Sequence, residues 1–312
     1  MRFAFTDDQL AFRDATRDFL ARECPPERVR AAWTNTDGRS GLWQQLGEMG
    51  LLGVLAPEEH GGLGGDFLDL VLLLEETGRA ALPEPVVEHA AVAVPGLGTD
   101  LVEPAASGEI TVTAGLPGSQ LVAYADPADR LLLDGDVVDP DDVVLTPCPA
   151  VDLARRLCSV DRGPFGYDGD AFDRGALGTA AQLVGLAQHL LDVTVDYAKA
   201  RHQFGVPIGS FQAVKHKLAD VRLALELARP VVYRGAHSVA HRDADRAVHV
   251  SMAKAYASDA ALLAAGHALQ VHGAIGYSYE HDLHLWTKRV WALAASWGDA
   301  AWHRHRIARA IL

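Results

Sequence analysis

The chain has 312 residues, 49% hydrophobic and 22% charged, the balance of a globular protein that can bury a sizeable core. Its net charge of −13 argues against a nucleic-acid surface, because phosphate binding needs clustered Lys and Arg. Three cysteines without C-x-x-C spacing predict reduced thiols rather than a disulfide framework, and no metal site is predicted. An acidic N-terminal segment and the lack of a long apolar run predict a cytoplasmic protein with no membrane span.

The first 108 residues are predicted to be mainly helical. Thr6 and Gln9 have the spacing of a capping box, and Pro25-Pro26 should end the helix that follows. Two more helices are expected on either side of a glycine-rich loop, and a last one should end before Pro104. These segments are 42–49, 61–65 (the loop), 67–79 and 84–108.

Between Glu109 and about Pro164 the pattern changes to short β-prone runs separated by Gly, Pro and Asp. Such runs between turn residues predict a small sheet. The expected strands are 110–113, 121–124, 130–138 and 143–146.

From Phe172 onward the helical period returns. The expected helices cover 180–200, 211–239, 244–269 and 283–312, and long helices with short connections predict a four-helix bundle. The predicted fold class is therefore mainly α with a small β domain. The predicted domains are 1–108, 109–164 and 165–312.

The turn Arg201-His202-Gln203-Phe204-Gly205 lies between two of these long helices. Its composition alone is compatible with a plain helix–turn–helix corner in which Gly205 is the C-cap and Pro207 prevents continuation. The turn also presents a guanidinium, an amide and an aromatic ring beside a helix N-terminus, and that set suits a diphosphate and a stacked base.

This turn resembles the R-x-Q-F-G turn of the acyl-CoA dehydrogenases. The stretch from Gln270 to Tyr277 is similar to the Q-x-x-G-G-x-G-Y turn of the same family, with Ala274 in place of the second glycine. Further segments resemble family landmarks in the right order: 50–53, 57–64, 75–76 and 172–188. The resemblance implies an N-terminal helical domain, a middle β domain and a C-terminal four-helix bundle.

The resemblance also implies the cofactor and the residues that contact it. In this family the two turns reach across a subunit interface to the adenosine half of an FAD that the neighbouring subunit mainly holds. Carried over to this sequence, the FAD-binding residues are Arg201, Gln203, Phe204, Gly205, Gln212, Gln270 and Gly273.

Family features that grip the flavin ring and remove the substrate proton are missing. The β region is short, the stretch from Leu116 to Ser119 is the nearest remnant of one ring loop, and no Trp lies between Trp43 and Trp286 to mark the other. The two positions that carry the catalytic Glu in family members are Trp297 and Gly175 here, so no catalytic residue is predicted. The nearby acids, Asp299 and Asp173, are expected to be helix-start or cap carboxylates.

These losses predict a division of labour. The chain resembles the shortened, non-catalytic subunit of actinobacterial α2β2 acyl-CoA dehydrogenases that act on steroid side chains. The implied partners are a homologous full-length subunit, an acyl-CoA thioester and an electron-transfer flavoprotein or similar acceptor. Two alternatives stay open: a self-sufficient homo-oligomeric flavoenzyme with Asp299 or Asp173 as its base, and a non-enzymatic scaffold that binds acyl-CoA or protein.

Overall fold

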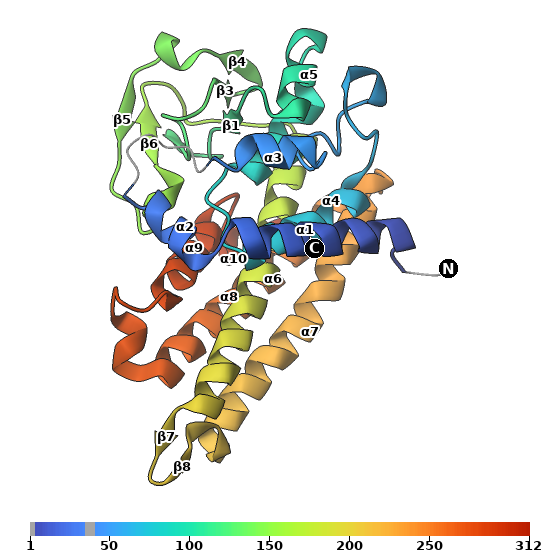
Figure 1. Ribbon diagram of the computed structural model, residues 1–312. Helices are drawn as coiled ribbons and strands as arrows, with labels where there is room; N and C mark the ends of the chain where they lie inside the picture. The colour runs from blue at the N-terminus through green and yellow to red at the C-terminus, as the bar shows by residue number, and fades with distance from the viewer. Residues whose placement is uncertain (1–3, 35–40) are drawn as a thin grey trace.

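The computed structural model describes residues 4–34 and 41–312 and places a bundle of long helices below a layer of short helices and small sheets (Figure 1). This arrangement confirms the predicted mainly α fold with a small β region. None of the helices in the described residues combines the length and hydropathy needed to cross a bilayer. The division into three domains stays a prediction, since one apolar core runs through the N-terminal helices and the bundle.

The bundle is built from α6, α7 and α8, with two shorter helices at the chain end. Helix α6 is longer than predicted, because Asp168 caps it and accepts a hydrogen bond from the Ala171 amide (2.6 Å). Its glycines weaken the helical signal but allow close packing: a Cβ on Gly185 would lie 1.9 Å from the Glu75 carbonyl oxygen. The helices are α6 (Gly169–Ala200), α7 (Gln212–Ala240), α8 (Arg246–His272), α9 (Leu283–Ala295) and α10 (Ala300–Ile311).

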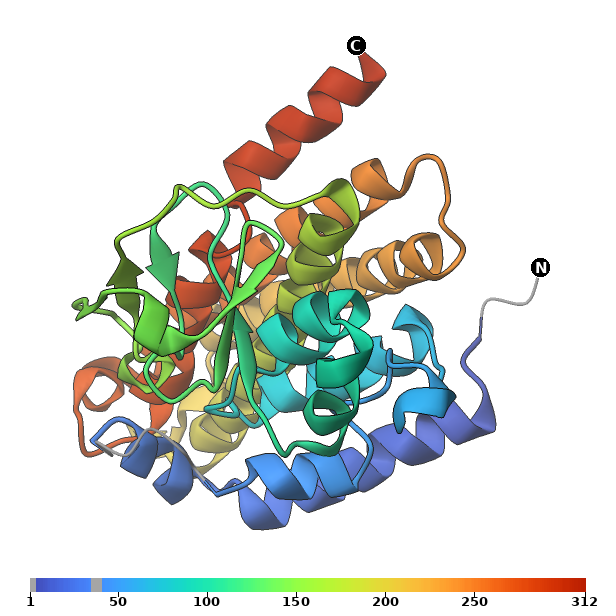
Figure 2. The same ribbon diagram turned by 90° about the horizontal axis from the view of Figure 1, so that it is seen from above.

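The single last helix predicted over 283–312 is wrong. The chain leaves the helix between Ala295 and Ala300, where Trp297 and Gly298 have φ of 56° and 84°. Asp299 then caps α10 by accepting a hydrogen bond from the Trp302 amide (2.7 Å). Figure 2 shows α10 extending away from the body of the fold.

The N-terminal helices follow the sequence signals closely. The Thr6–Gln9 capping box is present, and the chain breaks at the proline pair before a short second helix. The predicted helix over 67–79 is confirmed, with the glycine-rich loop before it. The elements are α1 (Asp7–Glu23), α2 (Pro26–Ala32), α3 (Trp43–Glu48), the 3₁₀ turn η1 (Glu58–His60) and α4 (Phe67–Arg79).

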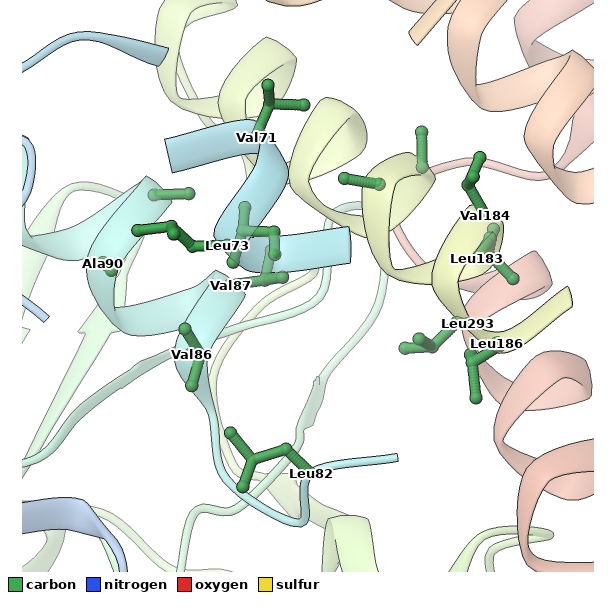
Figure 3. Packing of buried hydrophobic residues seen from close by; sticks show 14 of the residues in the cluster. Val71, Leu73, Leu82, Val86, Val87, Ala90, Leu183, Val184, Leu186 and Leu293 are labelled. Atoms are coloured by element: carbon green, nitrogen blue, oxygen red, sulfur yellow. The ribbon is translucent and has the colours of Figure 1, made fainter. Parts of the chain in front are cut away.

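The single helix predicted within 84–108 is instead three elements. A π-helical turn, η2 (Val87–Ala93), leads into the 3₁₀ turn η3 (Val94–Gly96), and α5 (Thr99–Ser107) follows. Pro95 and Gly98 break the run, and Pro104 lies inside α5 rather than after it. Side chains of η2 such as Val87 and Ala90 pack near Leu73 of α4 (Figure 3).

The β region forms two three-stranded sheets. The first has the order β1–β3–β4, with β1 parallel to β3, and the second has the order β2–β6–β5, antiparallel throughout. The single strand predicted over 130–138 is a hairpin, because Asp134 and Gly135 both take positive φ (55° and 89°). The strands are β1 (Val112–Ala114), β2 (Leu121–Val122), β3 (Arg130–Leu133), β4 (Asp136–Val138), β5 (Leu145–Pro147) and β6 (Cys158–Val160).

Three further short 3₁₀ turns lie in the β region and after α8. They are η4 (Pro140–Asp142) and η5 (Leu153–Arg155) between strands of the β region, and η7 (Gly273–Tyr277) after α8. The turn η7 contains Gly273, one of the predicted cofactor residues, so the bundle positions that residue at its outer end.

Candidate functional site

The predicted diphosphate turn is a β-hairpin at the end of α6. Strands β7 (His202–Gln203) and β8 (Val206–Pro207) pair, and Phe204 and Gly205 form the two-residue turn with φ of 55° and 82°. The expectation that Gly205 is a helix C-cap is therefore wrong. Arg201 is the C-cap, already extended, and its amide donates to the Tyr197 carbonyl oxygen (2.8 Å).

The side chains of this hairpin are open to solvent. Phe204 is 94% exposed, and its ring meets only the edge of Phe211 (centroids 6.3 Å apart) among the aromatic rings of the described residues. Arg201 is exposed, and its guanidinium makes no ion pair within residues 4–34 and 41–312. The 3₁₀ turn η6 (Ile208–Ser210) then leads into α7, whose first residue is Gln212. Within the described residues, the hairpin thus presents a cation without an ion-pair partner and an aromatic ring that is almost fully exposed.

The second predicted turn lies beside the first. Tyr197, one helical turn before Arg201, stacks on His272 (centroids 4.2 Å), and its hydroxyl donates to the His272 carbonyl oxygen (3.4 Å). Gly273 follows with φ 65° and ψ −141°, which only glycine adopts readily. The fold therefore brings the turns of Arg201 and Gln270 to one end of the bundle, and all seven predicted cofactor residues are exposed there. The sequence did not point to Tyr197 and His272 as the connection.

Gly175 and Trp297, the two positions that the family resemblance predicts for the catalytic Glu, lie against each other inside the fold. A Cβ on Gly175 would lie 2.5 Å from the indole of Trp297, so the indole occupies the space beside α6 that a side chain there would need. Trp297 is 1% exposed and packs near the rings of Tyr167 and Phe172 (centroids 5.4 and 6.2 Å). One apolar ring thus fills both positions, and neither carries a proton-accepting group.

The backbone around Trp297 is fixed by two buried basic residues. Lys254 of α8 donates to the carbonyl oxygens of Ala294 (3.1 Å) and Gly298 (2.9 Å). His303 of α10 lies 2.8 Å from the Trp297 carbonyl oxygen, which can only accept, so its Nε2 carries the proton. Burial lowers the pKa of His303 to about 3 and that of Lys254 to about 7, so His303 is neutral at neutral pH.

Replacing Lys254 with Met should remove a pH dependence of stability. Between pH 7 and 10.5 the unfolded chain holds a proton on this lysine that the folded chain has released. Raising the pH therefore stabilises the folded wild type, relative to Lys254→Met, by about 1.4 kcal/mol per pH unit. The measurement is the difference in free energy of unfolding between the two proteins across this range. Lys199→Met, at an exposed site, should follow the wild-type curve, and a pH-independent difference for Lys254→Met would contradict the argument.

The two nearby acids have structural partners. Asp299 is the cap of α10, as predicted. The expectation for Asp173 is wrong: it lies inside α6, 1% exposed, and binds the guanidinium groups of Arg306 (2.6 Å) and Arg246 (3.4 Å). Burial raises the pKa of Asp173, although Arg306 and, more weakly, Arg174 oppose that shift.

A buried ionic network joins the β region to the bundle. Asp152, 1% exposed, pairs with Arg289 of α9, which also donates to the Leu82 carbonyl oxygen (2.8 Å). Arg155 donates to Ser296 (3.0 Å), next to Trp297. These side-chain contacts therefore connect the loop between β5 and β6 directly to α9. No group of three His, Cys, Asp or Glu in the described part of the chain could hold a metal ion.

Comparison with known proteins gives the same relationship as the sequence motifs. The acyl-CoA dehydrogenase N-terminal domain matches residues 6–100, and the acyl-CoA dehydrogenase C-terminal domain matches residues 165–312. Acyl-CoA dehydrogenase IpdE2 of Mycolicibacterium smegmatis is 35% identical, over 91% of this chain and 93% of its own length.

Two solved structures have the same fold. The ChsE4-ChsE5 complex from Mycobacterium tuberculosis contains a chain that matches with a TM-score of 0.90 at 23% identity, over 99% of this chain and 98% of that one. The Tcur3481-Tcur3483 steroid ACAD matches with a TM-score of 0.86 at 25% identity, over 98% of each chain. With its two helical regions matched by the family's own domains and a relative of similar length at 35% identity, this chain belongs to the acyl-CoA dehydrogenases, a family of flavin-dependent oxidoreductases.

Proposed function

We propose that this chain is the non-catalytic subunit of an FAD-dependent acyl-CoA dehydrogenase and that it completes the adenosine site of a catalytic partner. The observation that carries the proposal is the Trp297 indole, which fills both positions where a catalytic base would stand while the cofactor turns stay exposed. FAD, when bound by the pair, supplies the hydride acceptor, and an electron-transfer flavoprotein or similar acceptor then reoxidises it.

The exposed turns fit the adenosine half of FAD. Arg201 offers an unpaired guanidinium for the diphosphate, and the N-terminus of α7 adds backbone amides from Gln212 onward. The ring of Phe204 is free to lie against the adenine, and Gln203, Gly205, Gln270 and Gly273 complete the set at the same end of the bundle. The ring loops that the family resemblance predicts are missing from this sequence, so the ring site belongs to the partner in this proposal.

The outer face of the bundle supports a protein partner. Leu223 and Leu227 of α7 are 60% and 54% exposed, and Leu262 of α8 is 41% exposed. Large apolar side chains exposed on the long helices of a bundle are typical of a subunit interface. The partner proposed is a homologous full-length acyl-CoA dehydrogenase in an α2β2 assembly, and the Tcur3481-Tcur3483 steroid ACAD, named for two chains, supports a bulky acyl-CoA thioester as substrate.

Co-expression with a full-length acyl-CoA dehydrogenase that carries the catalytic Glu, taken from the same genome, tests the proposal. The complex should carry one FAD per pair of unlike chains, measured by flavin absorbance and native mass, and the chain alone should be colourless. Arg201→Ala should weaken FAD binding by about 1.5–3 kcal/mol because a charge-assisted contact to phosphate is lost, and Arg201→Lys should restore only part of it. Arg162→Ala, which removes a half-exposed guanidinium of the β region, is the matched control.

Three results would contradict the proposal. A yellow homo-oligomer with one FAD per chain would show that the chain is self-sufficient. FAD occupancy and affinity that do not change in Arg201→Ala would remove the assigned role of the hairpin. A chain that binds no flavin with any partner would instead favour the scaffold alternative.

The self-sufficient alternative requires Asp299 or Asp173 to act as the base. Asp299→Asn should change turnover of the complex by no more than a few-fold, because Asn caps a helix as well as Asp does. Loss of a true general base costs about 10²–10⁴ in rate. The partner's catalytic Glu, changed to Gln, should abolish turnover in the same assay. If the complex with Asp299→Asn had no turnover although it was normally folded and fully loaded with FAD, that result would favour the alternative.

A further inference from the structure

Three cavities lie end to end along one side of α6, away from Trp297. Their volumes are about 370, 210 and 260 Å³. The first and second share Arg17, Glu76 and Arg79 as lining residues, and the second and third share Pro26, His189 and Trp286. Along α6 the lining advances from Gly185 to Tyr197, a rise of about 18 Å at 1.5 Å per residue. We call this row of cavities the α6 groove; α1 crosses α6 here (Figure 1).

The first cavity of the α6 groove is cationic. Four arginines, at positions 13, 17, 79 and 229, and two glutamates, Glu75 and Glu76, line it, so its lining residues carry a formal charge of +2. Asp14 and Asp192, outside the lining, pair with Arg13 and Arg79. The charges of both glutamates are already matched. Glu75 accepts hydrogen bonds from Arg229 (3.0 Å) and from the Tyr233 hydroxyl (2.9 Å), and Glu76 accepts two from Arg17.

Arg79 has free hydrogen-bonding capacity beside the second cavity. A guanidinium has five N–H donors, and only one of those of Arg79 is used by a carboxylate, that of Asp192 (2.7 Å), among the described residues. Arg79 lines both the first and the second cavity. A carboxylate placed at their boundary would therefore meet unpaired N–H groups.

The second cavity is mainly apolar and ends on an aromatic wall. Leu20, Ala21 and Pro26 line its sides, from α1 and α2. At its far end the His189 ring stacks on the Trp286 indole with centroids 4.1 Å apart and an interplanar angle of 7°. The Trp286 N–H donates to the Arg79 carbonyl oxygen (2.9 Å), which fixes the indole in place. Burial lowers the pKa of His189 to about 4, so the wall is uncharged at neutral pH.

From this arrangement we propose that the α6 groove binds a small amphipathic carboxylate. The carboxylate lies against Arg79, the apolar body fills the second cavity, and a ring or chain end packs on the His189–Trp286 wall. The volume of the second cavity exceeds the roughly 150 Å³ that holds one benzene ring, so a single-ring aryl acid fits. The ligand site is separate from the proposed FAD site, because none of the seven cofactor residues lines the groove. The third cavity does reach Tyr197 and His272, which connect the two cofactor turns, but the ligand body lies in the second cavity.

Binding of 4-phenylbutanoate to the full-length chain, in the form in which it purifies, tests the proposal by titration calorimetry. We expect saturable binding of one molecule per chain. Arg79→Met should weaken it at least about tenfold, because a charge-assisted contact is lost. Ala21→Trp should abolish it by filling the second cavity from exposed helix α1. The uncharged 4-phenylbutan-1-ol should bind at least about tenfold more weakly than the acid.

The matched controls use the same substitutions outside the α6 groove. Arg22→Met and Ala11→Trp change α1 at exposed positions that line none of the three cavities, and both should bind as the wild type does. If Arg79→Met and Ala21→Trp bound the acid as tightly as the wild type does, the proposal would be overturned. Equal affinity for the alcohol and the acid would overturn it too, as would displacement of the acid by inorganic phosphate at the same concentration, which would indicate a plain anion site.

Discussion

Trp297→Ala should lower the free energy of unfolding by about 3–5 kcal/mol. The indole is among the largest fully buried side chains of the described chain, and it packs directly over Gly175. A glycine offers no side chain that could move into the vacated space, so the cavity stays open and the full cost is felt. Urea unfolding of the two proteins, followed by circular dichroism, measures the difference.

Two further variants separate packing from other causes. Trp302→Ala removes the same ring from a position that is 46% exposed, and it should cost clearly less. Gly175→Ala should destabilise the wild type by about 1–3 kcal/mol through overpacking, but the same methyl should fit in the Trp297→Ala background. If the effects of Gly175→Ala and Trp297→Ala on the free energy of unfolding are additive, the indole does not occupy the space beside Gly175. The argument against a base at this site then fails.

Asp152→Ala should also cost about 3–5 kcal/mol, because it leaves the charge of Arg289 buried without its partner. Both side chains are less than 5% exposed, so water cannot replace the lost carboxylate. Equilibrium unfolding measures the effect, and the double variant Asp152→Leu with Arg289→Met should recover most of it, since an apolar pair of similar volume is tolerated.

Asp259→Ala is the surface control for this pair. Asp259 and Arg304 form an ion pair in which both side chains are more than half exposed, and such pairs contribute about 0–1 kcal/mol. A cost for Asp152→Ala within that range would mean that the junction between the β region and the bundle is hydrated.

Helices whose sequences carry clear local signals were predicted correctly. The Thr6–Gln9 capping box and the apolar run of α4 each fixed an element correctly. The start of α6 was missed because its glycines weaken the helical pattern, although the close approach of α4 requires them. The hairpin turns at Asp134 and Phe204 were read as a continuous strand and a helix end, because positive φ at a non-glycine residue is not visible in a sequence.

For the candidate site, the motifs located the two cofactor turns, but only the fold shows what connects them. The contact between Gly175 and Trp297 joins segments at opposite ends of the C-terminal half, so no local pattern could reveal it. Lys254 was also missed. The signal that could have identified it is a lysine inside an alanine-rich stretch of α8. A buried amino group on an apolar helix face needs hydrogen-bond acceptors, and here backbone carbonyl oxygens accept from it.

The indole over Gly175 also bears on how readily a chain of this kind could regain chemistry by mutation. A single change of Trp297 to Glu would leave a void where the ring had been and would place a new carboxylate in an apolar pocket. Larger neighbours would have to refill that void at the same time, and each partial step would be less stable than the starting sequence. Because of this packing, one substitution is enough to remove the catalytic base, but several simultaneous substitutions are needed to restore it.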